Sequence, residues 1–132
     1  MTSKVVYLGE LRTACEHLQS RSTIITDAPL DNEGKGEAFS PTDTVATALA
    51  SCMFTIMGIK ARNHGFDLKD TYAEVKKTMA SDPRRISKIE INFFLRAEYS
   101  EKHRSILERA ANTCPVIYSL HPEIEKIITF SY

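Results

Sequence analysis

Cys52 and Cys114 are the residues whose type and setting point most directly to chemistry in this sequence. Cys52 lies within a nearly uninterrupted apolar segment over residues 42–59, whereas Cys114 stands directly before Pro115. Paired cysteines in a small chain without an expected secretion signal favour redox chemistry, because a thiolate can attack a substrate and a second thiol can resolve the product as a disulfide. The sequence therefore predicts a dithiol that can cycle, provided that the fold brings the two sulfur atoms together.

Cys114 has a setting that favours ionisation. Pro115 lacks a backbone N–H and suits the first position of a helix, so Cys114 is expected to be the N-cap. The unpaired N–H groups of that helix would point toward the sulfur and lower the pKa of the thiol. The alternative interpretation is that Cys114 is a small buried hydrophobe that closes a helix.

Cys52 needs a cation from elsewhere, because the helix dipole gives little help in the middle of a helix. Arg12 and Arg21 lie in the predicted N-terminal strands and are the main candidates, with His17 a weaker one. Each of these residues is more often an ordinary surface charge. Taken alone, Cys52 would be interpreted as a core residue.

The third cysteine, Cys15, falls in a strand pattern without a helix end beside it, and we interpret it as structural. Three cysteines without a CxxC motif argue against a disulfide framework and a structural metal site. The histidines have no spacing typical of a metal site or a catalytic triad, so neither a metal nor a cofactor is expected. They are His17, His64, His103 and His121.

Length and charge restrict the class of protein. The sequence has 132 residues, with 17 Lys and Arg balanced by 17 Asp and Glu. This balance predicts no binding to nucleic acid or to anionic lipid, and no signal peptide or membrane span is expected. We therefore expect one cytoplasmic domain over residues 1–132, whose buried central helix would use most of its apolar side chains and favour oligomerisation.

The N-terminal half predicts short strands followed by a long helix. Residues 4–27 alternate in the manner of two or three antiparallel strands, and residues 27–39 have the composition of an exposed loop. Ser40 is the expected N-cap of a helix over residues 41–64, with Gly65 after its end. This helix is apolar nearly all round, which predicts a central position with close contacts on several sides.

The remaining sequence predicts a hairpin, two helices and a last strand. The hairpin strands cover 68–79 and 85–99, the helices cover 100–113 and 115–120, and the last strand covers 124–130. The expected fold class is α+β, with antiparallel sheet packed on helices.

Three motifs together resemble the OsmC/Ohr family of osmotically inducible and organic-hydroperoxide-resistance proteins. They are Ser-Pro-Thr-Asp at 40–43, Ala-Leu-Ala-Ser-Cys-Met at 48–53 and Ala-Ala-Asn-Thr-Cys-Pro-Val at 110–116. The similarity extends over the whole chain, including the opening segment 7–12 and the last strand. It implies antiparallel sheets wrapped around long central helices in an intertwined homodimer, with an active site at each interface.

The resemblance also implies roles for the cysteines. Cys52 matches the peroxidatic thiolate that attacks the O–O bond of an organic hydroperoxide. Cys114 matches the thiol that condenses with the resulting sulfenic acid, and an external dithiol then reduces the disulfide. In the family an arginine from the N-terminal strands activates the thiolate, and Arg12 is the first choice here, with Arg21 second.

At one position the sequence departs from the peroxidase pattern. Where those proteins have a glutamate that holds the arginine, directly after the proline, this chain has Thr42. Asp43 is the nearest carboxylate in sequence, but one position corresponds to about 100 degrees around a helix. The substitution indicates a broader OsmC-like branch with weaker or different thiol chemistry.

Two functions follow as hypotheses. The first is thiol-dependent reduction of organic hydroperoxides in oxidative-stress defence, with apolar residues near Met53 and Phe54 favouring organic over hydrogen peroxide. The second is a non-enzymatic dimer that binds a small apolar or thiol ligand in its interface pocket. Zinc or haem ligation is a third interpretation that no residue spacing supports.

Overall fold

The computed structural model describes all residues, 1–132, and the chain divides into two compact units. The first covers Met1–Val45 and the second covers Ala46–Tyr132. The long helix α1, Pro41–Asn63, begins in the first unit and continues into the second. The single domain expected over 1–132 stays a prediction.

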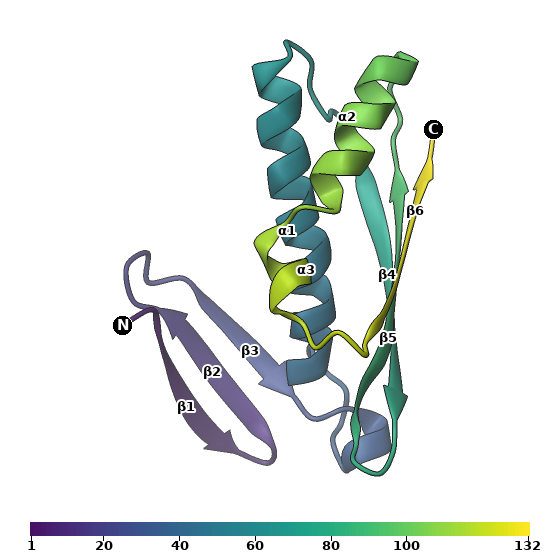
Figure 1. Cartoon of the computed structure of the whole chain (residues 1–132). Coiled ribbons are helices and arrows are strands. Elements are labelled where there is room, and N and C mark those ends of the chain that lie inside the picture. The colour runs from purple at the N-terminus through teal and green to yellow at the C-terminus, as the bar shows by residue number, and fades with distance from the viewer. The chain divides into compact units, whose positions relative to one another are not determined.

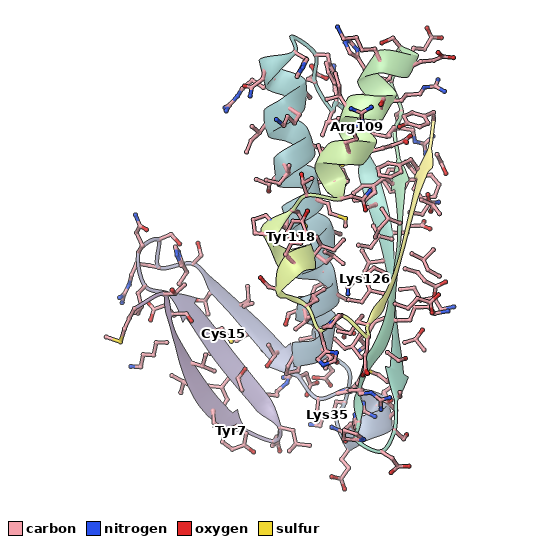
Figure 2. The ribbon with its side chains drawn as sticks, viewed as in Figure 1. Tyr7, Cys15, Lys35, Arg109, Tyr118 and Lys126 are labelled. Carbon is pink, nitrogen blue, oxygen red and sulfur yellow. The ribbon has the colours of Figure 1, made fainter.

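The first unit contains a three-stranded antiparallel sheet, which confirms the predicted N-terminal strands (Figure 1). The strands are β1 (Ser3–Gly9), β2 (Arg12–His17) and β3 (Thr23–Asp27), in that order. Strand β2 is central, and Cys15 lies on it (Figure 2). The predicted loop follows β3 and contains only the short 3-10 helix η1, Leu30–Asn32.

Helix α1 begins as its sequence predicts. Pro41 is the first helical residue, and the Ser40 hydroxyl accepts a hydrogen bond from the Asp43 backbone N–H at 3.0 Å. In return, the Asp43 carboxylate accepts from the Ser40 backbone N–H at 2.9 Å. This reciprocal capping box satisfies two N–H groups at the start of the helix. At the other end Gly65 has a φ of +78°, the left-handed conformation that follows many helices.

The second unit holds the predicted hairpin, two helices and last strand. Their bounds are β4 Tyr72–Ala80, β5 Arg85–Phe94, α2 Glu101–Ala111, α3 Pro115–Ser119 and β6 Glu125–Ser131. Strand β4 starts later than predicted because residues 68–71 form a turn, closed by a hydrogen bond from the Thr71 N–H to the Leu68 carbonyl.

One strand pair differs from the expected antiparallel sheet. In the sheet β4-β5-β6, β4 and β5 pair antiparallel, but β5 and β6 pair parallel, with Ile91 opposite Ile128. A parallel neighbour requires a crossover connection, and α2 and α3 supply it between the two strands. The α+β class holds, with the correction that the second sheet is mixed.

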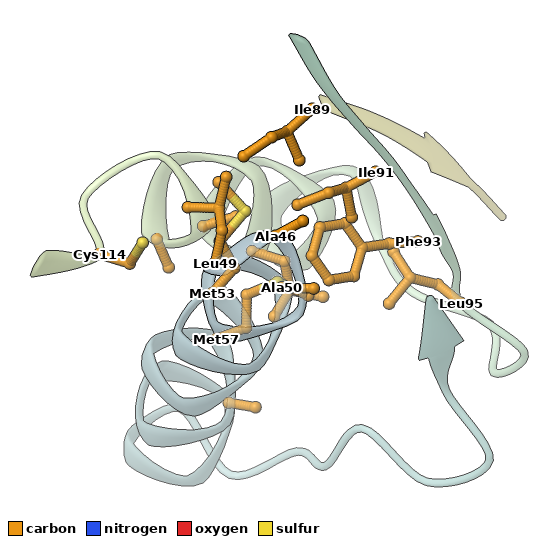
Figure 3. Packing of buried hydrophobic residues seen from close by; sticks show 14 of the residues in the cluster. Ala46, Leu49, Ala50, Met53, Met57, Ile89, Ile91, Phe93, Leu95 and Cys114 are labelled. Carbon is orange, nitrogen blue, oxygen red and sulfur yellow. The ribbon is translucent and has the colours of Figure 1, made fainter. Parts of the chain in front are cut away.

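The core of the second unit lies between this sheet and the helices (Figure 3). Ile89, Ile91 and Phe93 alternate along β5 and point to one face, where they pack with Leu49 and Met53 of α1. All five side chains are almost completely buried.

Within one chain, helix α1 is buried on one face only, which differs from the burial on several sides expected from its composition. Its buried residues are Ala46, Leu49, Ala50, Met53, Met57 and Ala61. A second set of residues at spacings of three and four is exposed, and we call it the outer face of α1. It consists of Val45, Ala48, Ser51, Thr55 and Ile59.

By length and composition α1 would also qualify as a membrane-spanning helix. The core helix of a globular protein meets the same description, and Leu49, Met53 and Met57 are fully buried within the fold. The expectation that the chain does not cross a membrane stays a prediction.

Candidate active site

Cys114 is the N-cap of α3, as the Cys-Pro step predicts. Its sulfur accepts a hydrogen bond from the Ile117 backbone N–H at 3.4 Å, and Pro115 occupies the first turn. Its side chain is fully buried at the edge of the core, beside α1 (Figure 3). Cys114 therefore combines the two settings that the sequence left as alternatives, a helix N-terminus and a buried packing position.

The predicted ionisation of Cys114 was wrong in direction. Burial raises the pKa of the Cys114 thiol, because removing a thiolate from water costs more than the Ile117 N–H returns. A hydrogen bond and charge interaction with Cys52 raise this pKa further, whereas the N–H groups of Ile117 and Val116 lower it. The Cys114 thiol therefore keeps its proton to a higher pH than an ordinary cysteine does.

The structure brings the Cys52 and Cys114 thiols together. The Cys52 thiol is close enough to raise the pKa of Cys114, and both are free thiols. Cys114 is buried, whereas Cys52 is partly exposed on the side of α1 next to the outer face. A partly exposed thiol that a molecule can reach, backed by a buried thiol, is an arrangement in which oxidation of the first can be followed by disulfide formation.

Arg12 lies in the first unit at the start of β2, where two acidic residues contact it. Its Nη2 lies 2.9 Å from the Glu37 carboxylate and 3.6 Å from the Asp27 carboxylate. The ladder between β2 and β3 places Arg12 directly opposite Asp27. The guanidinium is therefore held by Asp27 of strand β3 and by Glu37 of the loop that follows β3.

The two acidic partners of Arg12 differ in burial, and burial determines which ion pair holds the arginine more strongly. The Asp27 side chain is 1% exposed, whereas that of Glu37 is 57% exposed. An exposed ion pair contributes only about 0–1 kcal/mol, whereas removing one partner of a buried pair costs about 3–5 kcal/mol. Arg12 is itself 32% exposed, so its pair with Asp27 lies between these limits but above the pair with Glu37.

Arg21, the second candidate cation, has a different setting. It pairs with Glu16 at 2.8 Å, and its side chain is 74% exposed. Its φ of +65° places it in the turn between β2 and β3. An exposed pair in a turn holds a side chain loosely, so Arg12 is the better-fixed of the two arginines.

Asp43 has a structural task in the described fold, as part of the capping box of α1. One of its carboxylate oxygens accepts from the Ser40 N–H, so this atom is committed to the helix start. Its role as a substitute for the glutamate absent at Thr42 stays a prediction.

Cys15 lies on β2, opposite Val5 of β1 and Ile24 of β3. Its Sγ lies 3.6 Å from the Thr13 hydroxyl oxygen. The structural role expected for Cys15 stays a prediction.

Sequence reasoning missed Asp27 and Glu37. Asp27 stands at the boundary between a predicted strand and a predicted loop, where an acidic residue is ordinary. The available signal was the strand pairing itself, because an antiparallel register that joins β2 to β3 brings Arg12 and Asp27 face to face. That register depends on the length of the turn, which the sequence pattern leaves open.

Comparison with known proteins assigns this architecture to one group. The family model described as OsmC-like protein matches residues 34–128. No curated protein matches the sequence. Among solved structures, a Psychrobacter arcticus 273-4 protein named for an osmotic stress induced and detoxification response is 55% identical, with 98% of this chain and 95% of that chain covered and a TM-score of 0.95.

More distant structures share the fold. An organic hydroperoxide resistance protein OsmC of Legionella pneumophila is 14% identical, with a TM-score of 0.77 over 100% of this chain and 98% of that one. An organic hydroperoxide resistance protein of Elizabethkingia anophelis is also 14% identical, with a TM-score of 0.76 over 99% of this chain and 96% of that one. At this identity the likeness is one of fold alone.

Proposed function

Because the chain belongs to the OsmC-like protein family, we propose that it is a cysteine-dependent reductase of organic hydroperoxides. The observation that carries the proposal is the proximity of the Cys52 thiol to Cys114, whose pKa it raises. Three things add to it: the names of the distant structures, the access to Cys52, and the apolar residues around it. We place this activity in the cytoplasm and in defence against oxidative stress.

The proposed reaction has three balanced steps. The Cys52 thiolate attacks one oxygen of the O–O bond, which breaks to give Cys52 sulfenic acid and an alkoxide that takes a proton and leaves as the alcohol. The Cys114 thiol then condenses with the sulfenic acid, forming a Cys52–Cys114 disulfide and releasing water. An external dithiol finally reduces this disulfide and is itself oxidised to a disulfide.

The raised pKa of Cys114 suits the resolving role in this scheme. A thiol that keeps its proton can act as a hydrogen-bond donor to a neighbouring sulfur. It also keeps a second negative charge away from the attacking sulfur. Ionisation of Cys114 is then needed only after Cys52 has been oxidised and its negative charge is gone.

Arg12 is the proposed cation that stabilises the Cys52 thiolate and the charge on the departing oxygen, as the family resemblance implies. Its fixed guanidinium supports this choice over Arg21. The part assigned to Asp43 is to support the arginine from the start of α1. These residues lie in the first unit and the cysteines in the second, so their meeting belongs to the proposal.

We further propose that the working form is a homodimer. Apolar side chains are exposed on both faces of the β1-β2-β3 sheet, because successive strand residues point to opposite faces and Val5, Val6, Tyr7 and Leu8 are all exposed. The outer face of α1 adds Val45 and Ile59. Exposed apolar surfaces of this kind are typical of protein interfaces, and a second copy of the chain is the proposed occupant.

The test is turnover of an alkyl hydroperoxide with a small dithiol as reductant. Cys52→Ser is expected to abolish turnover, because no sulfenic acid can form. In a single-turnover assay without dithiol, Cys114→Ser is expected to reduce one peroxide per subunit and then stop, with a sulfenic acid at Cys52 that a dimedone probe detects by mass spectrometry. Equal turnover in the wild type and both variants would overturn the assignment.

The second candidate function is a non-enzymatic dimer that binds a small apolar or thiol ligand. The observation in its favour is the raised pKa and complete burial of Cys114, which a packing role would also produce. The two functions differ in the behaviour of Cys52 toward peroxide. If Cys52 stays reduced during hours with excess alkyl hydroperoxide while a small thiol ligand binds stoichiometrically, the binding function replaces the enzymatic one.

A further inference from the structure

We propose that Asp27 is the positioning residue for Arg12, and that it does in this chain what the glutamate absent at Thr42 would otherwise do. This inference rests on the proposed function, since it concerns the cation of that site. It assigns the main part of this task to a strand residue of the first unit, and only the remaining part to Asp43 of helix α1. Glu37 is a secondary contact that Asp27 itself organises.

The backbone supplies the first argument. Arg12 and Asp27 are directly paired residues of β2 and β3, so the strand ladder fixes the distance between their Cα atoms. Two hydrogen bonds flank the pair: the Asp27 N–H donates to the Phe39 carbonyl at 3.0 Å, and the Ala28 N–H donates to the Leu11 carbonyl at 3.2 Å. The carboxylate therefore projects from a framework that cannot shift independently of Arg12.

The side chains supply the second argument. One Asp27 oxygen, Oδ2, contacts Arg12 Nη2 and also accepts a hydrogen bond from the Glu37 backbone N–H at 3.0 Å. Asp27 thus holds the loop residue that makes the shorter contact with Arg12 at 2.9 Å. Loss of the Asp27 charge would release both the direct contact and the support for Glu37.

Asp27 and Arg12 leave part of their hydrogen-bonding capacity unused. Asp27 Oδ1 is buried without a hydrogen-bond partner, and so is Arg12 Nε. Only Nη2 of Arg12 is engaged by the two carboxylates. A guanidinium has five N–H donors; since Nη2 faces the carboxylates and Nε is buried, Asp27 fixes Arg12 while the two donors of Nη1 stay uncommitted to either carboxylate and can serve a thiolate or a peroxide oxygen.

The test compares Asp27→Asn with the control Glu37→Gln in a Cys15→Ser/Cys114→Ser background, where Cys52 is the only thiol. The readout is the second-order rate of Cys52 alkylation by iodoacetamide as a function of pH, which reports the thiolate. Asp27→Asn is expected to slow alkylation at neutral pH about tenfold, the equivalent of one unit in the Cys52 pKa. Glu37→Gln should change it by no more than about threefold.

The sign of the effect separates positioning from simple charge. Removing a negative charge would by itself favour a thiolate and accelerate alkylation. Slower alkylation therefore requires that Arg12 has lost its position. Faster or unchanged alkylation in Asp27→Asn would overturn the inference.

Two further variants separate positioning from a merely structural role. In an Arg12→Met background the Asp27→Asn change should have no further effect on alkylation, because a positioning residue acts only through the arginine. Thr42→Glu added to Asp27→Asn should recover at least part of the lost rate. If Asp27→Asn does not fold, Asp27→Glu, which moves the carboxylate by one methylene, takes its place in the same cycle, with a smaller expected loss.

Failure of the inference can be told apart from failure of the proposed function. If Arg12→Met slows both alkylation and single-turnover peroxide reduction but Asp27→Asn changes neither, the peroxidase stands and only the part of Asp27 is lost. If Cys52→Ser leaves peroxide reduction unchanged, the proposed function fails whatever Asp27 does. An effect of Asp27→Asn that persists undiminished in the Arg12→Met background also overturns the inference.

Discussion

At the scale of single residues, Cys114 shows two opposing effects on one thiol. A helix N-terminus lowers a cysteine pKa, and burial raises it. Helix α3 has only five residues, and one backbone N–H makes the hydrogen bond to the sulfur. Complete burial outweighs so small a contribution, and the neighbouring Cys52 adds to it. A residue can therefore be an N-cap and still keep its proton.

The raised pKa of Cys114 predicts how the stability of the reduced protein depends on pH. The native thiol keeps its proton where the unfolded thiol has lost it, so the native state binds more protons and the free energy of unfolding falls as pH rises. This contribution is fully present below the unfolded pKa of about 8.5 and is lost as pH rises through the native value. Urea unfolding between pH 7 and pH 10.5, with reductant present, measures it.

Cys114→Ser is the informative comparison, because serine does not ionise in this range. Its unfolding free energy should fall less steeply above about pH 8.5 than that of the wild type. Burial and the Glu108 hydrogen bond also raise the pKa of Tyr132, which adds an alkaline loss common to both proteins. Equal slopes in the two proteins would mean that the native environment does not hold the proton on Cys114.

At the scale of elements, the start of α1 determines where the cysteine-bearing helix begins. Ser40 is 1% exposed, and its hydroxyl caps the Asp43 N–H. Without the hydroxyl, that N–H loses its partner in a part of the structure that water reaches poorly. The helix must then begin with an unsatisfied donor or lose its first turn.

We expect Ser40→Ala to lower the free energy of unfolding by about 1–2 kcal/mol, the upper part of the range for an N-cap serine. Ser100→Ala is the matched control, because Ser100 caps α2 through the His103 N–H at 3.2 Å but is exposed. Water can replace its hydroxyl, so its cost should be about 0.5–1 kcal/mol. Urea denaturation of both variants measures the difference, and a larger loss in Ser100→Ala would contradict the importance given to burial.

The elements also show how far the sequence could predict the structure. Helix ends were predictable because Ser40, Pro41 and Gly65 act locally, through backbone groups within one turn. The parallel pairing of β5 and β6 was not, since it depends on the path of the intervening helices. The site shows the same division. The N-cap at Cys114 could be predicted from adjacent residues, whereas the positions of the carboxylates around Arg12 depend on strand register and loop closure.

For the whole molecule, the apolar composition of α1 and its burial on a single face both favour assembly into a dimer. The apolar composition of α1 predicted contacts on several sides, but one chain covers a single face. The outer face consists of small and β-branched residues, which allow another backbone to approach closely. Cys52 lies next to this face, so a partner that covers it would also form part of the surroundings of the thiol.

One charge placed on the outer face of α1 tests the proposed dimer. Thr55→Arg places a guanidinium in the middle of that face and is expected to convert the proposed dimer to monomer, because the charge would have to lose its water without a partner. Ser105→Arg is the matched control, an exposed hydroxyl residue within α2. Sedimentation equilibrium should give a dimer for the wild type and Ser105→Arg, with dissociation at least about a hundredfold more favourable in Thr55→Arg. A Thr55→Arg protein that is folded and as dimeric as the wild type would exclude the outer face of α1 from the interface.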